Sequence, residues 1–296
     1  MSAASDAPAN PNSEAPMNPA TATTTIGVVG AGQMGSGIAQ LAAASGFRVV
    51  LHDADPDSLR RARHSISRRL GDAGDAQSRL LFASDLTDLR EADLIVEAIV
   101  ESEPAKKALF ASLDGLAKPS AILASNTSSI SITRLASSTS RPARVIGMHF
   151  MNPPPVMKLV EIVRGSETSD EVFEVVKSLA ERLGKTVICS RDYPGFVVNR
   201  ILMPMINEAF HALYTGVATK EDIDAGMRLG TNHPMGPLQL ADFIGLDVCL
   251  SIMRVLHNGL GEDKYWPCPL LAQYVDAGRL GKKSGAGVYM YRNGRL

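Results

Sequence analysis

The sequence lacks long hydrophobic runs, paired cysteines and a dominant charge. No apolar run approaches the roughly 20 residues that a membrane-spanning helix requires, so we expect no spanning segment. The three cysteines, Cys189, Cys249 and Cys268, have no paired spacing, which argues against a disulfide framework or a zinc site and favours a reducing compartment. We expect Cys189, which stands in an apolar run, to be a small buried residue. A net charge of −1 gives no overall attraction to nucleic acid or to an anionic membrane.

The amino end is poor in large apolar side chains. Residues 1–24 are mainly Ala, Ser, Thr, Pro and Asn, which cannot bury enough surface to offset their ordering entropy, so they predict a disordered tail. This tail has neither the positive start nor the apolar stretch of a secretory signal, and it lacks the arginines of an organellar transit peptide. The last residues, Gly294-Arg295-Leu296, differ from a peroxisomal address in having glycine for serine. We expect a cytoplasmic location, with the peroxisomal matrix as the alternative.

Beyond the tail, apolar segments of strand length alternate with helical ones. Residues 25–30 predict a strand that ends in glycines, residues 33–46 predict a helix, and the alternation continues to a last strand at 185–190. This rhythm predicts a parallel sheet that is covered by helices on both faces. We therefore expect an α/β fold in which residues 25–191 form a doubly wound, Rossmann-type domain.

The rhythm changes at "RDYPGFVVNR", after which only helical signals follow. Residues 192–296 thus predict a smaller, all-helical domain, in which Thr219 and Asp222 have the spacing of a capping box. The helix that starts near Phe196 is apolar on more than one side. Burial within the domain would account for this pattern, but we favour contact with a second subunit.

The segment "GAGQMG" has the spacing G-x-G-x-x-G, with Gly30, Gly32 and Gly35. A strand precedes it, a helix follows, and an acidic residue lies about 20 positions further on, which is the context of a dinucleotide site. Gly30 would form the tight turn, Gly32 would admit a pyrophosphate, and Gly35 would let helix and strand pack closely. Together with Gln33 and Met34, these residues predict a phosphate site at the helix N-terminus.

Asp53 ends the second predicted strand. Its carboxylate can accept hydrogen bonds from both ribose hydroxyls of NAD, and it would repel the additional phosphate of NADP. The alternatives are a solvated aspartate or a helix cap. The complete pattern favours NAD binding.

A histidine and a glutamate accompany two apolar runs that are separated by three prolines, in "HFMNPPPVMKLVE". His149 follows a predicted strand in a sheet whose strand ends form the ligand crevice, and imidazole titrates near neutral pH, as a general base must. Glu161 lies 12 positions later, where alternation buries it in the next strand. A carboxylate bonded to one ring nitrogen fixes the tautomer and stabilises the imidazolium. The alternative for Glu161 is a solvated residue at a strand end.

Six ordered segments carry a family likeness: "VVGAGQMGSGIAQ", "VEAIVE", "SNTSS", "HFMNPPPVMKLVE", "PGFVVNR" and "HPMGP". Over residues 26–291 the chain closely resembles the L-3-hydroxyacyl-CoA dehydrogenases, and most closely their 3-hydroxybutyryl-CoA dehydrogenase branch. The resemblance implies NAD-dependent, reversible oxidation of a (3S)-3-hydroxyacyl-CoA to the 3-oxoacyl-CoA. It also implies that the helical domain, residues 192–296, contributes to the substrate site and forms a homodimer, and we expect no metal site.

The resemblance also implies roles for individual residues. His149 would be the general base and Glu161 would orient it, while Ser128 would hydrogen-bond the 3-oxygen of the substrate and Asn199 would help to hold His149 and the acyl group. Glu101 and Lys106 would lie near the nicotinamide ribose. The resemblance less directly implies positions near the cofactor or substrate for three further residues, Asn152, Arg164 and Lys283.

One departure concerns the segment after the second strand. Relatives carry a longer helical hairpin there that helps to bind the CoA nucleotide, whereas this chain has a shorter segment with a break at "GDAGDAQ". The shortening puts CoA affinity in doubt. Five arginines of the segment could pair with CoA phosphates or could form a solvated basic face: Arg60, Arg61, Arg63, Arg68 and Arg69.

Two other functions compete with the acyl-CoA dehydrogenase. The shortened hairpin is compatible with a dehydrogenase of a small, CoA-free hydroxy acid, although the proline turn and the "GKKSGAGVY" segment favour the acyl-CoA substrate. A non-catalytic dinucleotide-binding protein is the other alternative. The complete set of Ser128, His149, Glu161 and Asn199 argues against it, because a protein without catalytic activity does not need these residues.

Overall fold

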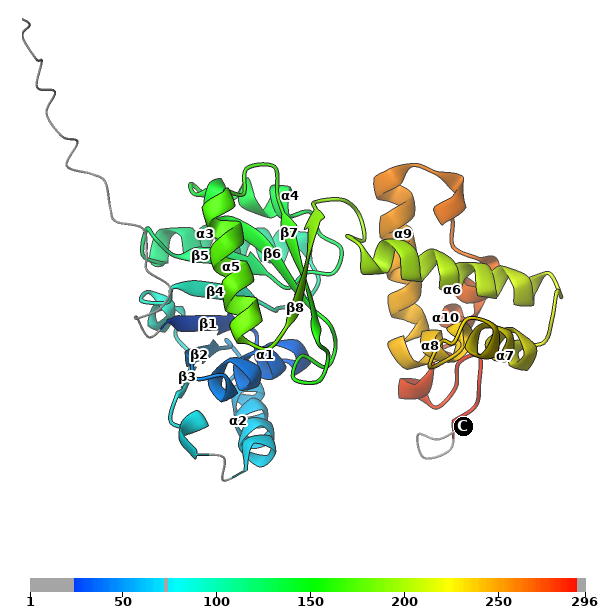
Figure 1. Ribbon diagram of the computed structural model, residues 1–296, viewed down its shortest axis with the longest axis horizontal. Coiled ribbons are helices and arrows are strands. Elements are labelled where there is room, and N and C mark those ends of the chain that lie inside the picture. Colours follow the sequence, from blue (N-terminus) through cyan, green and yellow to red (C-terminus); the bar gives the residue numbers. More distant parts are fainter. Residues whose placement is uncertain (1–23, 72–73, 292–296) are drawn as a thin grey trace, which may run out of the picture.

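The computed structural model describes residues 24–71 and 74–291. The predicted tail, apart from Thr24, and the carboxyl-terminal Gly294-Arg295-Leu296 lie outside these residues. Figure 1 shows two units, one built around a sheet and the other built of helices. Within the described ranges, no helix is both long enough and apolar enough to cross a membrane.

The first unit contains an eight-stranded sheet in the order β3-β2-β1-β4-β5-β6-β7-β8. All neighbouring strands are parallel except β6 and β7, which are antiparallel because the proline turn joins them directly. The strands are β1 (Thr25–Val29), β2 (Arg48–His52), β3 (Leu80–Ala83), β4 (Leu94–Glu97), β5 (Ile122–Ser125), β6 (Val145–Phe150), β7 (Leu159–Arg164) and β8 (Thr186–Arg191).

Helices cover both faces of this sheet, as the alternating pattern predicts (Figure 1). One hydrophobic core lies under α1, α2 and α5, and the other lies under α3 and α4. The helices are α1 (Gln33–Ala44), α2 (Pro56–Leu70), α3 (Glu103–Leu116), α4 (Ile132–Ala136) and α5 (Asp170–Arg182), with short 3-10 turns η1 (Gly74–Ala76), η2 (Leu86–Leu89) and η3 (Pro142–Arg144).

The second unit follows β8 and has its own core. Thr219 caps α7 by accepting the N–H of Asp222, so the predicted capping interaction is confirmed. Gly245, with φ of +109°, separates α8 from α9 within a continuous helical signal. The helices are α6 (Val198–Tyr214), α7 (Lys220–Gly230), α8 (Pro237–Ile244), α9 (Leu246–Leu260) and α10 (Pro269–Asp276), with 3-10 turns η4 (Asp263–Tyr265) and η5 (Lys282–Ser284).

Three features differ from the sequence-based expectations, the first being that β6 and β7 are antiparallel in a sheet that was predicted to be parallel. Strand β3 was not expected, because four apolar residues at a sheet edge cannot be distinguished from a helical fragment by periodicity. The prediction that Cys189 is buried is wrong, since its side chain is exposed. The reason is its position on β8, the last strand of the sheet, whose outer side has no neighbouring strand.

Candidate active site

The glycine turn between β1 and α1 has room for a ligand at one position only. Gly30 has φ of +102° and a Cβ there would lie 2.6 Å from the carbonyl oxygen of Ala98, while a Cβ on Gly35 would lie 1.7 Å from the carbonyl oxygen of Gly30. A Cβ on Gly32 would meet nothing within 4 Å. The turn therefore packs tightly on the sheet and leaves Gly32 facing open space.

That open space lies at the N-terminus of α1, where the first backbone N–H groups have no partner within the helix. Gln33 follows Gly32 there and is exposed, while Met34 is half-buried. Unpaired N–H groups and the helix dipole suit a pyrophosphate. The residues present thus fit the phosphates of NAD.

Asp53 lies beside the same turn. One carboxylate oxygen accepts the N–H of Ala31 at 2.7 Å, and the other accepts the N–H of Asp55 at 2.9 Å. The cap of α2 is Asp55, whose side chain accepts the N–H groups of Asp57 and Ser58. The helix-cap alternative for Asp53 is thereby removed, and its position next to the phosphate turn suits a ribose.

His149 and Glu161 face each other across the antiparallel pair β6 and β7. The distance from His149 Nδ1 to Glu161 Oε2 is 2.7 Å, and the residues are 5 % and 0 % exposed. The expectation that the proline turn makes these strands neighbours is confirmed, and Glu161 is not a solvated residue at a strand end. The other glutamate oxygen, Oε1, accepts the backbone N–H groups of Val197 and Val198, each at 3.0 Å.

These contacts determine the charge of Glu161. Burial raises the pKa of a carboxyl group, but the hydrogen bond to His149 and the two N–H donors outweigh it, so the pKa of Glu161 lies below its usual value. Glu161 is therefore a carboxylate at neutral pH. An anionic partner requires that His149 Nδ1 carry a proton, which leaves Nε2 as the nitrogen able to accept one.

Ser128 stands in front of that nitrogen. Its Oγ is 3.2 Å from His149 Nε2. Glu101 holds the loop that carries Ser128, because Glu101 Oε1 accepts the Thr127 hydroxyl at 2.6 Å, the Ser128 N–H at 3.0 Å and the Ser129 hydroxyl at 3.0 Å. Burial raises the pKa of Glu101, and Lys106 together with these donors lowers it further than burial raises it.

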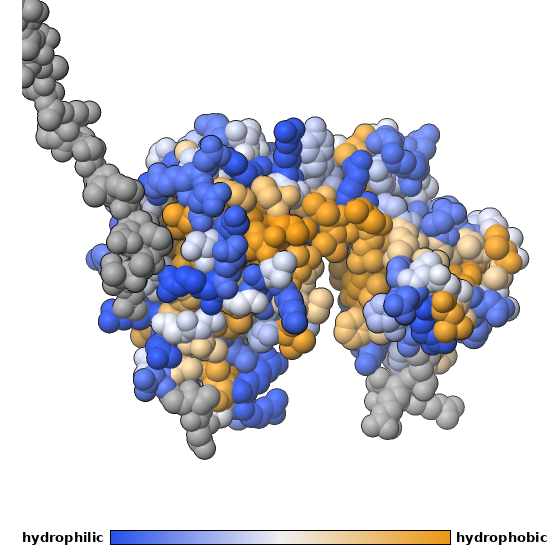
Figure 2. Space-filling model, viewed as in Figure 1, coloured by the Kyte–Doolittle hydropathy of each residue, from blue (hydrophilic) through white to orange (hydrophobic). Residues whose placement is uncertain are grey.

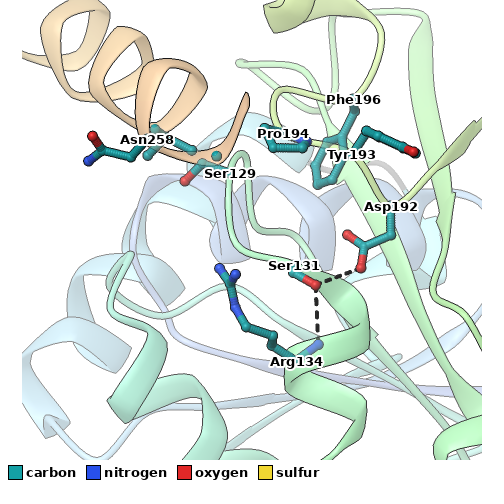
Figure 3. Close-up of a pocket in the computed structure, with 10 residues that line it drawn as sticks. Ser129, Ser131, Arg134, Asp192, Tyr193, Pro194, Phe196 and Asn258 are labelled. Atoms are coloured by element: carbon teal, nitrogen blue, oxygen red, sulfur yellow. Dashed lines mark hydrogen bonds between the residues drawn. The ribbon is translucent and has the colours of Figure 1, made fainter. Parts of the chain in front are cut away.

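Two cavities open beside Ser128, and Ser129 lines both. The first has a volume of about 360 Å³ and lies between the sheet unit and α9, with Met34, Glu101 and Lys106 in its wall. The second, of about 430 Å³, lies at the linker between the units (Figure 3). There, Asp192 accepts the hydroxyl of Ser131 at 2.6 Å and so ties the linker to α4.

The remaining predicted residues are more scattered. Asn152 accepts a hydrogen bond from the Gln33 amide at 3.0 Å, which links the proline turn to α1. Asn199 is buried in the first turn of α6. Lys283 pairs with Asp247 on α9, which lines the first cavity. Arg164 lies toward the other end of β7, where it pairs with Asp170 at 2.6 Å, and it contacts none of the other predicted site residues.

Helix α2 carries the five arginines of the shortened segment and is the one α-helix between β2 and β3 among the described residues. Arg60 pairs with Asp57, Arg61 pairs with Asp55, and Arg63 lies over the ring of Phe82. Part of this basic face is thus engaged within the protein.

Sequence reasoning missed two residues of the site. Glu97, at the end of β4, is fully buried and bonded to Lys106. The signal was present, because a carboxylate in the apolar run "LIVE" is as anomalous as Glu161 in its own strand. Phe196 has φ of +50°, and its ring packs edge-on against the His149 ring at 5.8 Å. No local pattern distinguishes Phe196 from an ordinary core phenylalanine.

Comparison with known proteins agrees with this geometry. Residues 25–193 match the family model of the 3-hydroxyacyl-CoA dehydrogenase NAD binding domain, and residues 195–291 match that of the 3-hydroxyacyl-CoA dehydrogenase C-terminal domain. A probable 3-hydroxybutyryl-CoA dehydrogenase of Deinococcus radiodurans is 57 % identical over 276 residues, which cover 90 % of this chain and 99 % of the relative. The 3-hydroxybutyryl-CoA dehydrogenase of Bradyrhizobium diazoefficiens is 53 % identical over 281 residues, covering 91 % and 96 %.

The fold has a similar counterpart among solved structures. The crystal structure of the (S)-3-hydroxybutyryl-CoA dehydrogenase of Ralstonia eutropha has a TM-score of 0.89 and 46 % identity to this chain, and the match covers 92 % of this chain and all of the other. The two family models together span nearly all of the described residues. The chain therefore belongs to the 3-hydroxyacyl-CoA dehydrogenase family, with the NAD-binding domain of that family followed by its C-terminal domain.

Proposed function

We propose that the protein catalyses the reversible, NAD-dependent oxidation of a short-chain (3S)-3-hydroxyacyl-CoA, with 3-hydroxybutyryl-CoA as its substrate. In this proposal, residues 25–191 bind NAD and residues 192–296 contribute to the substrate site. The observation that carries the proposal is the alignment of Ser128 Oγ, the His149 ring and the anionic Glu161 at 3.2 Å and 2.7 Å. The names of the relatives supply the acyl-CoA class and the short chain.

In the proposed mechanism, Ser128, His149 and Glu161 each have one role. NAD supplies the acceptor for the hydride on C3 of the substrate. His149 Nε2 takes the proton of the 3-hydroxyl, and Glu161 holds the ring in the required tautomer and stabilises the imidazolium. Ser128 donates to the 3-oxygen, which polarises the carbonyl in the reverse direction. Asn199, buried in the first turn of α6, is proposed to help hold His149 and the acyl group.

The substrate is tested first in the direction of reduction. Consumption of NADH is measured with acetoacetyl-CoA, with free acetoacetate, and with NADPH in place of NADH. We expect turnover with acetoacetyl-CoA and NADH, and much weaker turnover with NADPH, because the Asp53 carboxylate repels the additional phosphate.

The other outcomes separate the competing functions. Turnover of acetoacetate alone would identify a dehydrogenase of CoA-free acids, which the shortened segment at α2 permits. NADH binding without turnover of either compound would contradict a catalytic role for the His149 and Glu161 pair.

We also propose that the protein is a homodimer that forms through the helical unit. Ile201 on α6 is 67 % exposed and Val217 is 75 % exposed, and both line a groove of about 940 Å³ together with the exposed Trp266. Figure 2 shows a band of hydrophobic residues that crosses from the sheet unit to the helical unit. Large exposed apolar side chains gathered on one groove are typical of an interface.

A charge on this groove should separate the subunits. Ile201→Glu is expected to raise the dimer dissociation constant by at least about 30-fold, because the carboxylate would be buried without a partner. Light scattering after size exclusion measures the mass, and Leu81→Glu, an exposed leucine on β3, is the control. A wild-type monomer, or a dimer that Ile201→Glu leaves intact, would contradict the proposal.

A further inference from the structure

A buried carboxylate that the proposed mechanism does not use lies beneath the first cavity. Glu97 ends β4 and is 0 % exposed. Its Oε1 accepts the N–H of Ile99 at 2.8 Å and the ammonium of Lys106 at 2.5 Å, and its Oε2 accepts the hydroxyl of Ser125 at 2.6 Å. Every one of these partners donates a hydrogen bond, which suits a carboxylate.

Lys106 connects this carboxylate to a second one. The ammonium is 1 % exposed and also lies 3.3 Å from Glu101 Oε2. Glu97, Lys106 and Glu101 thus form a cluster of two anions and one cation, with a net charge of −1. Asp247, which also lines the cavity, pairs with Lys283, so this pair adds no net charge.

The topology places this cluster under the nicotinamide half of NAD. Dinucleotides lie across the carboxyl ends of the strands in this type of sheet. The phosphate turn and Asp53 occupy the ends of β1 and β2, so the other half extends over β4 and β5 toward His149 on β6. Glu101 and Lys106 line the cavity on that path, and Glu97 lies directly below Lys106.

We infer that the net negative charge of the Glu97–Lys106–Glu101 cluster determines how strongly the site prefers NAD over NADH. The nicotinamide ring carries a positive charge when oxidised and none when reduced, and every other group of the cofactor is the same in both forms. A fixed anion near the ring therefore stabilises NAD selectively. Glu97 acts as a positioning residue, because it holds Lys106 and sets the charge without touching the cofactor.

The cluster also completes the charge balance of the proposed reaction, on which this inference partly rests. When the alcohol is oxidised, its C3 hydride neutralises the nicotinamide and its hydroxyl proton charges His149. The positive charge thus moves from a site beside the cluster to a site beside Glu161. Because an anionic group lies at each end of this path, neither the cationic nicotinamide nor the imidazolium is left uncompensated.

The ratio of two dissociation constants tests the inference. Binding of NAD and of NADH is measured by calorimetry on the full chain, without acyl-CoA, for the wild type and Glu97→Gln. For a unit charge at roughly 8 to 15 Å and an effective dielectric constant of about 20, the ratio Kd(NAD)/Kd(NADH) should rise about 5- to 30-fold. A loss of contacts to the ribose would lower the affinities for NAD and NADH equally, so that this effect cancels in the ratio.

A second change separates charge from packing. In Glu97→Gln/Lys106→Met, one anion and one cation are removed, so the net charge returns to −1 and the ratio should return to that of the wild type. A ratio that stays high in the double variant, or that never rises in the single one, would overturn the inference. Glu103→Gln is the control, since Glu103 starts α3 nearby but pairs with Lys107 and Arg134 outside the cluster.

Glu101→Gln changes the same net charge from the exposed side of the cluster. Glu101 is 41 % exposed in its side chain, so Glu101→Gln removes one charge and leaves the buried Glu97–Lys106 pair intact. Its ratio should rise by a similar factor, and an unchanged ratio would overturn the inference. Because no step requires turnover, a failure to oxidise acyl-CoA would contradict the proposed function alone.

Discussion

His149→Gln is expected to lower kcat for acetoacetyl-CoA reduction by about 10²- to 10⁴-fold, because His149 is the group proposed to exchange a proton with the 3-oxygen. The Nδ1 atom of His149 is hydrogen-bonded to Glu161. The Nε2 atom, which lies 3.2 Å from the Ser128 hydroxyl, is therefore the nitrogen that can meet the substrate. Glutamine can occupy the space and donate to Glu161, but its amide neither accepts nor releases a proton near neutral pH. The measurement is NADH consumption under saturating substrate.

NADH binding should persist in this variant, because the residues proposed to bind the cofactor phosphates and the adenosine ribose lie in the turn between β1 and α1 and directly after β2. A loss confined to kcat, with the dissociation constant for NADH nearly unchanged, would separate chemistry from binding. His64→Gln provides the control, since His64 is exposed on α2. Turnover within a few-fold of the wild type would show that His149 is not the base.

Glu161→Gln is expected to reduce kcat by about 10²- to 10⁴-fold, the upper end being the effect of the equivalent change in a Ser-His-Asp triad. Oε1 of Glu161 accepts the N–H groups of Val197 and Val198, so the carbonyl of a glutamine will keep that position. The amide NH₂ then faces His149 Nδ1 and donates to it. This reverses the tautomer and leaves Nε2 protonated, so the ring cannot accept the substrate proton.

The tautomer of the His149 ring distinguishes this reversal from a loss of folded structure. Nitrogen chemical shifts of the His149 ring should show the proton on Nδ1 in the wild type and on Nε2 in Glu161→Gln. Unchanged kinetics would mean that Glu161 has no part in the reaction. Inactivity with an unchanged tautomer would mean that it acts in some way other than by orienting the ring.

The same change should alter the response of stability to acid. The pKa of Glu161 in the folded protein lies below its ordinary value of 4.5, so between these two values the unfolded chain binds more protons than the folded one. The stabilisation is therefore complete above about 4.5 and is lost as the pH falls through the lower, folded value. Thermal unfolding of Glu161→Gln should lack this part of the acid dependence, and an identical pH profile would contradict it.

Local sequence patterns determined which helices and strands form and the order in which they follow one another. The spacing of Gly30, Gly32 and Gly35 after an apolar strand and before a helix predicts a phosphate turn, because the whole motif lies within one short stretch of sequence. The alternation of strands and helices predicts a doubly wound sheet, and the proline turn between His149 and Glu161 predicts that their strands are neighbours. These inferences depend on residues close together in the sequence.

Only the tertiary structure decided how these parts meet. The backbone N–H groups of Val197 and Val198, 36 and 37 residues away in the sequence, donate to the second carboxylate oxygen of Glu161. Ser128, 21 residues from His149 in the sequence, lies next to its ring. Glu97 reads as one anomalous residue in a strand until the fold brings Ser125 to it. Likewise, the exposure of Cys189 follows from which strand lies at the edge. Pairing between distant segments depends on the three-dimensional packing of the whole sheet. Hydrophobic periodicity along the chain reports the type of each local element and does not predict which distant elements will pair.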